Sequence, residues 1–131
     1  NELSRYLQEH STPEDKVFFW GQTDYLYADA QRRPASRYIH FYPLTGYIWG
    51  SPLRYDPDYD TTYRILAGSW DILQEEFRRS PPLFFIDTDI GTEVKKYPPS
   101  RYPFLKNLLA NKYEVVFSTP QGIIYRRVDR Q

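Results

Sequence analysis

Two short runs of large apolar residues constrain the fold of this sequence more than any other feature. They are Val17–Trp20 and Leu83–Ile86, and neither run alternates between apolar and polar positions. A strand that is apolar on both faces suits the centre of a parallel sheet better than a half-exposed position. Gly21 ends the first run, and an Asp-Thr-Asp sequence follows the second. We therefore predict two central strands, each followed at its carboxyl end by polar residues.

Helical spacing of apolar residues predicts helices near residues 3–10, 24–30, 60–79 and 102–111. The longest begins at an Asp60 cap and carries one apolar stripe, made of Tyr63, Leu66, Trp70, Leu73 and Phe77. Further strands are expected over residues 38–41, 115–117 and 123–125, the last pairing back as an antiparallel edge. Strands that alternate with helices predict a single α/β domain over residues 1–131. The expected architecture is three-layered and Rossmann-like, with a mostly parallel open sheet and an antiparallel C-terminal hairpin.

Composition excludes several classes of function. Lysine plus arginine and aspartate plus glutamate number 17 each, so no net field favours nucleic acid, and we expect no nucleic-acid partner. Cysteine is absent, which excludes disulfides, a thiol nucleophile and a cysteine metal site. No apolar run approaches the ~18 residues of a membrane span, so the chain is expected to be soluble. Methionine is also absent, which indicates a piece cut from a longer protein.

Aromatic residues are unusually abundant, with 13 Tyr, 8 Phe and 3 Trp making up 18% of the chain. Tyrosine is favoured where one end of the side chain is apolar and the other is wet, as at an interface, a sugar-binding surface or a membrane-proximal face. The alternative is that most of these tyrosines edge the core. Residues 42–60 combine several aromatics with Pro and Gly and lack clear periodicity. Because structureless connections of this length are uncommon, we interpret the segment as a lid or a contact surface.

The first strand leads into the candidate binding residues. Ligands of open α/β sheets gather beyond the carboxyl ends of the strands, and Arg binds phosphate in a fork geometry. A basic cluster of Arg32, Arg33 and Arg37 follows nearby. Its alternative role is an exposed turn with surface ion pairs, which contribute little individually. The candidate binding residues are therefore Trp20, Gly21, Tyr25, Arg33 and Arg37.

The second strand ends in a candidate metal site. Asp87 and Asp89 could hold a divalent cation against a phosphate. The alternative, which is the commoner role of such loop carboxylates, is that they cap the following turn. Asp56, Asp58 and Asp60 copy the first ligands of a calcium loop, but the glycine and the glutamate that such a loop needs further on are missing. No catalytic, dinucleotide or phosphate-loop motif occurs, so we predict no cofactor and no catalytic residue in this chain.

Taken in order, the segments resemble a known pattern. They are a Thr-Pro-Glu-Asp turn at 12–15, Val-Phe-Phe-Trp-Gly at 17–21, Arg-Arg-Pro-Ala-Ser-Arg-Tyr at 32–38, Pro-Pro-Leu-Phe-Phe-Ile-Asp at 81–87, Lys-Tyr-Glu at 112–114 and Ile-Tyr-Arg-Arg at 124–127. This set resembles the soluble C-terminal domain of bacterial polytopic membrane glycosyltransferases of family 39, the dolichyl-phosphate-mannose protein mannosyltransferase-like type. The resemblance covers nearly the whole chain, and Trp20-Gly21 and the Arg33–Arg37 run are its most specific parts.

The resemblance implies a parent enzyme that transfers sugar from a polyprenyl-phosphate donor on the extracytoplasmic side of a bacterial membrane. Its catalytic carboxylate would lie in the membrane-embedded part of the same polypeptide, and that part would be the partner of this chain. The chain itself would be an accessory domain with a sugar or lipid-phosphate contact. An alternative interpretation, drawn from Gly21, Arg33, Arg37 and the Asp87/Asp89 pair, is a free-standing α/β domain that binds a nucleotide or phosphorylated small molecule at the strand ends.

Overall fold

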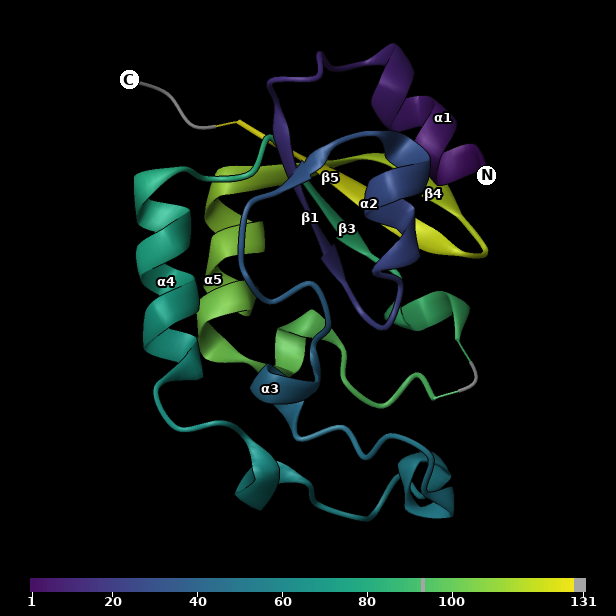
Figure 1. Ribbon diagram of the computed structural model, residues 1–131, viewed down its shortest axis with the longest axis vertical. Coiled ribbons are helices and arrows are strands. Elements are labelled where there is room, and N and C mark those ends of the chain that lie inside the picture. The colour runs from purple at the N-terminus through teal and green to yellow at the C-terminus, as the bar shows by residue number, and fades with distance from the viewer. Residues whose placement is uncertain (93, 129–131) are drawn as a thin grey trace.

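A computed structural model describes residues 1–92 and 94–128 as an α/β arrangement around a five-stranded sheet (Figure 1). The strand order is β2-β1-β3-β5-β4, and the sheet is open. The strands are β1 (Lys16–Trp20), β2 (Arg33–Pro34), β3 (Phe84–Asp87), β4 (Tyr113–Thr119) and β5 (Gly122–Arg127). The two apolar runs and the C-terminal hairpin therefore form strands as predicted.

The sheet is mixed, where a mostly parallel one was expected. Strand β1 pairs in parallel with β2 and β3, whereas β5 runs antiparallel to both β3 and β4. The hairpin was expected to end in an edge strand at 123–125, but that strand, β5, lies inside the sheet and β4 forms the edge. The difference arises because β5 also pairs with β3, with Phe84 opposite Arg126, so that β5 is the second neighbour of β3.

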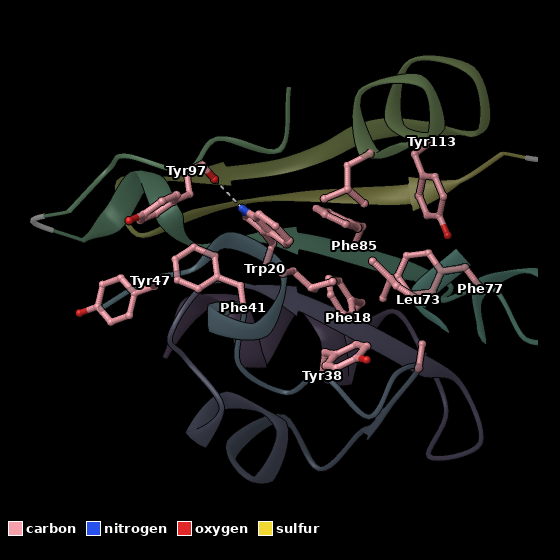
Figure 2. Close-up of a cluster of buried hydrophobic side chains, with 13 residues drawn as sticks. Phe18, Trp20, Tyr38, Phe41, Tyr47, Leu73, Phe77, Phe85, Tyr97 and Tyr113 are labelled. Carbon is pink, nitrogen blue, oxygen red and sulfur yellow. Dashed lines mark hydrogen bonds between the residues drawn. The ribbon is translucent and has the colours of Figure 1, made fainter. Parts of the chain in front are cut away.

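Alternating side chains of the central strands divide the core into two clusters. Val17 and Phe19 of β1 pack in one cluster with side chains of α1 (Glu2–Glu9) and α2 (Tyr25–Ala30). Phe18 and Trp20 pack in the other with side chains of α3 (Tyr42–Thr45), α4 (Ser69–Arg79) and α5 (Pro103–Lys112). Figure 2 shows this second cluster, with Trp20 at its centre. Because both faces of β1 and β3 are covered, these strands need no polar positions.

The strand expected at 38–41 does not form, and that prediction is wrong. The structure places the short strand β2 earlier, and residues 35–41 form bends. A local hydrogen bond satisfies part of this backbone, because the Tyr38 N–H donates to Ser36 Oγ at 3.0 Å. The Ser36 hydroxyl in turn donates to Glu76 of α4 at 2.6 Å. Such side-chain bonds compete with a strand ladder. The aromatic rings of Tyr38 and Phe41 are buried in the core from these bends.

The long helix expected from Asp60 is also shorter than predicted. Helix α4 begins at Ser69, and residues 62–64 form a separate 3₁₀ turn. Gly68 precedes the helix with φ of +80°, a left-handed conformation that interrupts the helical path. Tyr63 and Leu66, which were placed on the buried stripe, are exposed. The stripe is real only from Trp70 onward, where it includes the buried Leu73 and Phe77.

Candidate functional site

The carboxyl ends of β1 and β3 lie side by side, with Trp20 opposite Asp87. From β1 the chain continues to β2 on one side of it, and later reaches β3 on its other side. This reversal of direction is the position where open α/β sheets bind ligands. A pocket of about 520 Å³ opens there. We call it the strand-end pocket. Its walls include Gln22 and Thr23 after β1 and Thr92 and Val94 after β3.

Gly21 joins the end of β1 to Gln22 and Thr23 of the pocket wall. Its φ of +143° is accessible to glycine and strained for other residues, and a side chain there would overlap Thr88 Oγ1. Thr88 Oγ1 lies 2.8 Å from Thr23 Oγ1, and it donates to the Trp20 carbonyl at 2.9 Å. The close approach of the two strand ends therefore requires a glycine at this position. Gly21 itself is buried and does not line the pocket.

The sequence-predicted residues do not form one group. Tyr25 lines the strand-end pocket and is 64% exposed. Trp20 is fully buried, and its indole N–H donates to the Tyr97 carbonyl at 2.7 Å (Figure 2). Arg33 is exposed, and its backbone lies opposite that of Lys16 in the sheet, at the other end of β1. Arg37 forms a 3.0 Å ion pair with Glu76 of α4.

The basic cluster is thus dispersed by the fold. Arg32, the third member, is buried and donates to the side chain and the carbonyl of Ser11 at 2.8 and 3.0 Å. It joins the start of β2 to the chain that follows α1. Arg37 has the protein's own carboxylate as its partner, which is one of the roles considered for it. Neither Arg33 nor Arg37 lines the strand-end pocket.

The remaining walls of the pocket come from residues 47–60, which we call the aromatic loop. This loop supplies Tyr47, Trp49, Arg54 and Tyr55 to the pocket. Trp49 is 73% exposed, whereas Tyr47 is buried at the base. The sequence singled out this segment as a contact surface from its composition, but it gave no signal for Arg54 or for the individual aromatic walls. Gln22, Thr23 and Thr92 were also missed, because isolated polar residues in loops carry no pattern.

Arg54 is the cation of the pocket. Its guanidinium lies over the Tyr55 ring, 4.2 Å from the ring centroid, and donates to the Ser51 carbonyl at 2.6 Å. It forms no ion pair within residues 1–92 and 94–128. Burial raises the pKa of the Tyr47 hydroxyl, while nearby Arg54 and a hydrogen bond with Gln22 oppose that shift. The pocket therefore presents a positive group, neutral hydroxyls and an amide.

A second pocket of about 570 Å³ adjoins the first. Its walls are His40, Tyr42, Tyr47, Trp49 and Arg64, and we call it the His40 pocket. Tyr47 and Trp49 line both pockets, so these two rings form the wall between them.

Asp87 and Asp89 lie below the surface, at 5% and 3% exposure. The Asp89 N–H donates to Asp87 Oδ1 at 3.0 Å, and the Tyr97 N–H donates to Asp89 Oδ2 at 3.1 Å. Desolvation by burial raises the pKa of Asp87 to about 6, and it also raises the pKa of Asp89. Asp89 Oδ1 is buried without a hydrogen-bond partner among the described residues.

As ligands for a cation, these two carboxylates offer few free oxygens. The described part of the chain contains no group of three or more His, Cys, Asp or Glu side chains arranged to hold a metal. Neither aspartate lines the strand-end pocket. The hydrogen bond from the Asp89 N–H to Asp87 is the turn-capping contact considered as the alternative. A metal role for the pair stays a prediction.

Fold and pocket together define this chain as a mixed α/β protein with an aromatic-walled pocket at the carboxyl ends of its parallel strands. Comparisons with protein-family models, with curated proteins and with solved structures each gave no match to this chain. Among the described residues, no helix has the length and apolar character needed to cross a membrane.

Proposed function

We propose that this chain is the extracytoplasmic accessory domain of a membrane glycosyltransferase, and that its strand-end pocket binds the sugar-phosphate end of a polyprenyl-phosphate sugar. The ordered sequence segments suggest the parent enzyme. The observation that carries the binding proposal is the position of Arg54, a cation without an ion pair among the described residues, beside the rings of Trp49 and Tyr55. The catalytic groups would belong to the membrane-embedded part of the same polypeptide.

The chemistry of the walls suits such a ligand. An aromatic ring offers an apolar face to the carbon skeleton of a sugar, and Trp49 is exposed enough to do so. Gln22, Thr23 and Thr92 supply neutral hydrogen-bonding groups for hydroxyls. The guanidinium of Arg54 matches the geometry of a phosphate, and charge-assisted bonds of this kind are the strong ones. Pockets of this type, which combine aromatic walls with convergent polar groups, are typical of small-molecule sites.

The Rossmann-like, three-layer description of the fold belongs to the same proposal. Its support is the division of the core into two clusters, one with side chains of α1 and α2 and one with side chains of α4 and α5. The parallel part, β2-β1-β3, is where a doubly wound arrangement would place its ligand.

A second candidate function is a free-standing domain that binds a nucleotide or a phosphorylated small molecule. The position of the pocket at the β1/β3 strand ends favours it, because nucleotides commonly bind at such positions. A base could stack on Trp49 as a sugar would, so the two candidates share the pocket and differ in the ligand.

Calorimetric titration of the purified chain tests the binding proposal. The probes are a hexose 1-phosphate, the free hexose, inorganic phosphate and a nucleoside monophosphate. We expect the hexose 1-phosphate to bind most tightly, and we expect Arg54→Ala to weaken its binding about tenfold, as loss of a charge-assisted hydrogen bond predicts. Arg33→Ala is the matched control, because Arg33 is exposed at the far end of β1.

Each outcome decides between the candidates. Tighter binding of the nucleoside monophosphate would replace the first candidate by the second. Equal losses from Arg54→Ala and Arg33→Ala would remove the strand-end pocket as the site. The membrane context has its own test in the residues encoded before Asn1: several apolar stretches of ~20 residues would support it, and a start codon just upstream would refute it.

A further inference from the structure

We propose that the strand-end pocket and the His40 pocket form one cleft that binds a glycan of at least two sugar residues. This inference rests on the proposed function, because it assumes that a sugar occupies the first pocket. It extends that function from a single sugar to a chain of sugars, with one ring on each side of the Tyr47–Trp49 wall.

The wall between the pockets is narrow. The ring centroids of Tyr47 and Trp49 are 6.0 Å apart, with planes inclined by 62°. Tyr47 is buried at the base, whereas Trp49 projects with most of its surface exposed. On the far side, the His40 ring lies 6.4 Å from the Trp49 ring. A ligand that fills the first pocket can therefore continue past Trp49 into the second without crossing a thick barrier.

The Tyr47 side of the wall is also fixed in place. The Tyr47 N–H donates to Thr45 Oγ1 at 3.2 Å, and the Tyr47 ring packs against Phe41 and Tyr97 with centroids 5.8 and 6.2 Å away. Both of those rings belong to the buried core. This side of the wall is thus in place before any ligand binds, which lowers the ordering cost of binding a two-ring ligand.

The chemistry of the His40 pocket favours a second sugar over an apolar chain. Arg64 is exposed, and its guanidinium forms no ion pair or hydrogen bond with the described residues, so its donors are available. The hydroxyl-bearing ring of Tyr42 is half exposed, and His40 is held by Asp24 at 3.3 Å. Rings combined with polar donors match the apolar face and the hydroxyl edge of a sugar.

Charge argues against a single-stranded nucleic acid, which also stacks on exposed aromatic rings. Three exposed carboxylates, Asp56, Asp58 and Asp60, lie in the aromatic loop between Arg54 and Arg64 in the sequence. The chain as a whole has no net charge. A polyphosphate backbone needs a positive groove, whereas a glycan with one terminal phosphate needs only a local cation such as Arg54.

The test compares a hexose 1-phosphate with a disaccharide 1-phosphate of the same reducing-end sugar. We expect wild-type protein to bind the disaccharide about fivefold to tenfold more tightly, the gain typical of one further aromatic contact. Tyr42→Ala and Arg64→Ala should remove this gain and leave hexose 1-phosphate binding unchanged. Trp49→Ala should weaken binding of both ligands. Tyr63→Ala is the matched control, because Tyr63 is an exposed aromatic that lines neither pocket.

The two proposals fail in different ways. If the hexose 1-phosphate binds but the disaccharide binds no more tightly, the two-pocket cleft is refuted and the proposed function stands. If only the disaccharide binds, and Tyr42→Ala removes that binding, the cleft is supported and the single-sugar assignment is wrong. If neither binds, both proposals are refuted. If a single-stranded oligonucleotide binds more tightly and Trp49→Ala removes it, the glycan assignment is overturned. The melting temperature of each variant verifies that it is folded.

Discussion

The buried carboxyl pair at the end of β3 should make the protein less stable as the pH rises. Burial raises the pKa of Asp87 from its ordinary value of 3.8 to about 6 in the folded state. Below pH 3.8 the carboxyl is protonated in both the folded and the unfolded protein, so its burial as a charge does not lower the free energy of unfolding. Between pH 4 and 6 the folded protein binds the extra proton, so stability falls through this window and then levels off. Asp87→Asn removes the charge and retains an acceptor for the Asp89 N–H.

The magnitude follows from the size of the pKa shift. A shift of about two units corresponds to about 3 kcal/mol of difference between the two protonation states, at 1.36 kcal/mol per unit. The free energy of unfolding of Asp87→Asn, relative to wild type, should therefore rise by about 3 kcal/mol between pH 4 and pH 7. Asp89 is close enough to titrate together with Asp87, so the measured midpoint belongs to the pair.

Urea unfolding followed by tryptophan fluorescence, repeated from pH 4 to pH 8, measures this difference. Comparing variant with wild type at each pH cancels the contributions of the carboxylates that do not interact with Asp87. Asp29→Asn is the matched control, because it makes the same change at a carboxylate that is exposed at the end of α2. A flat difference for Asp87→Asn would show that burial does not penalise the Asp87 charge, and the reasoning would be wrong.

Three further predictions concern the same end of the sheet and its surroundings. Gly21→Ala should destabilise the protein by about 2 kcal/mol or more in urea unfolding, because the φ of Gly21 is strained for alanine and the new Cβ would overlap Thr88. An unchanged urea midpoint would contradict this close approach. Arg37→Ala should lower the free energy of unfolding by less than about 1 kcal/mol, because Arg37 is mostly exposed. Glu76→Ala should lower it more, because it also leaves the Ser36 hydroxyl without its acceptor, and the reverse order would refute this assignment. Magnesium and manganese test the metal prediction for the carboxyl pair. A rise in melting temperature that Asp87→Asn removes would establish a metal site, whereas an unchanged melting temperature would leave the pair its turn-capping role, in which two of its oxygens accept backbone N–H groups.

Strands β1, β3, β4 and β5 were predictable because their signal is local. An unbroken apolar run such as Val17–Trp20 can be satisfied only between two covered faces, and the turn between β4 and β5 is written in adjacent residues. The long helix failed for a reason that is not local. An apolar spacing continued upstream of α4, but Leu66 N–H donates to the Pro43 carbonyl at 2.9 Å, and Gly68 turns the chain. Contacts with distant residues overrode the helical pattern there.

The candidate site was harder to predict than the fold, because its walls come from three separate segments. Sequence proximity suggested that Arg32, Arg33 and Arg37 act together. In the structure, Arg32 instead points inward to Ser11, Arg33 lies on the edge strand β2, and Arg37 pairs with Glu76 of α4. Arg54 has no neighbouring motif, and only the fold brings it beside the strand ends. Composition could identify residues 42–60 as unusual, but it could not say which of their side chains face a pocket.

The aromatic loop can hold fixed pocket walls although it contains little regular structure, because its two ends are joined at the core. Thr61 Oγ1 donates to the Thr45 carbonyl at 2.7 Å in a buried position. Gly46, with φ of +78°, lets the two segments meet, since a Cβ there would overlap the Thr61 carbonyl. The ammonium group of Lys96 lies over the Tyr59 ring, 5.6 Å from its centroid. A loop closed in this way has lost much of its conformational entropy on folding, so a ligand has less left to order when it binds. Irregular backbone and a preorganised site are therefore compatible in this protein, and Gly46 matters to the pocket although it does not line it.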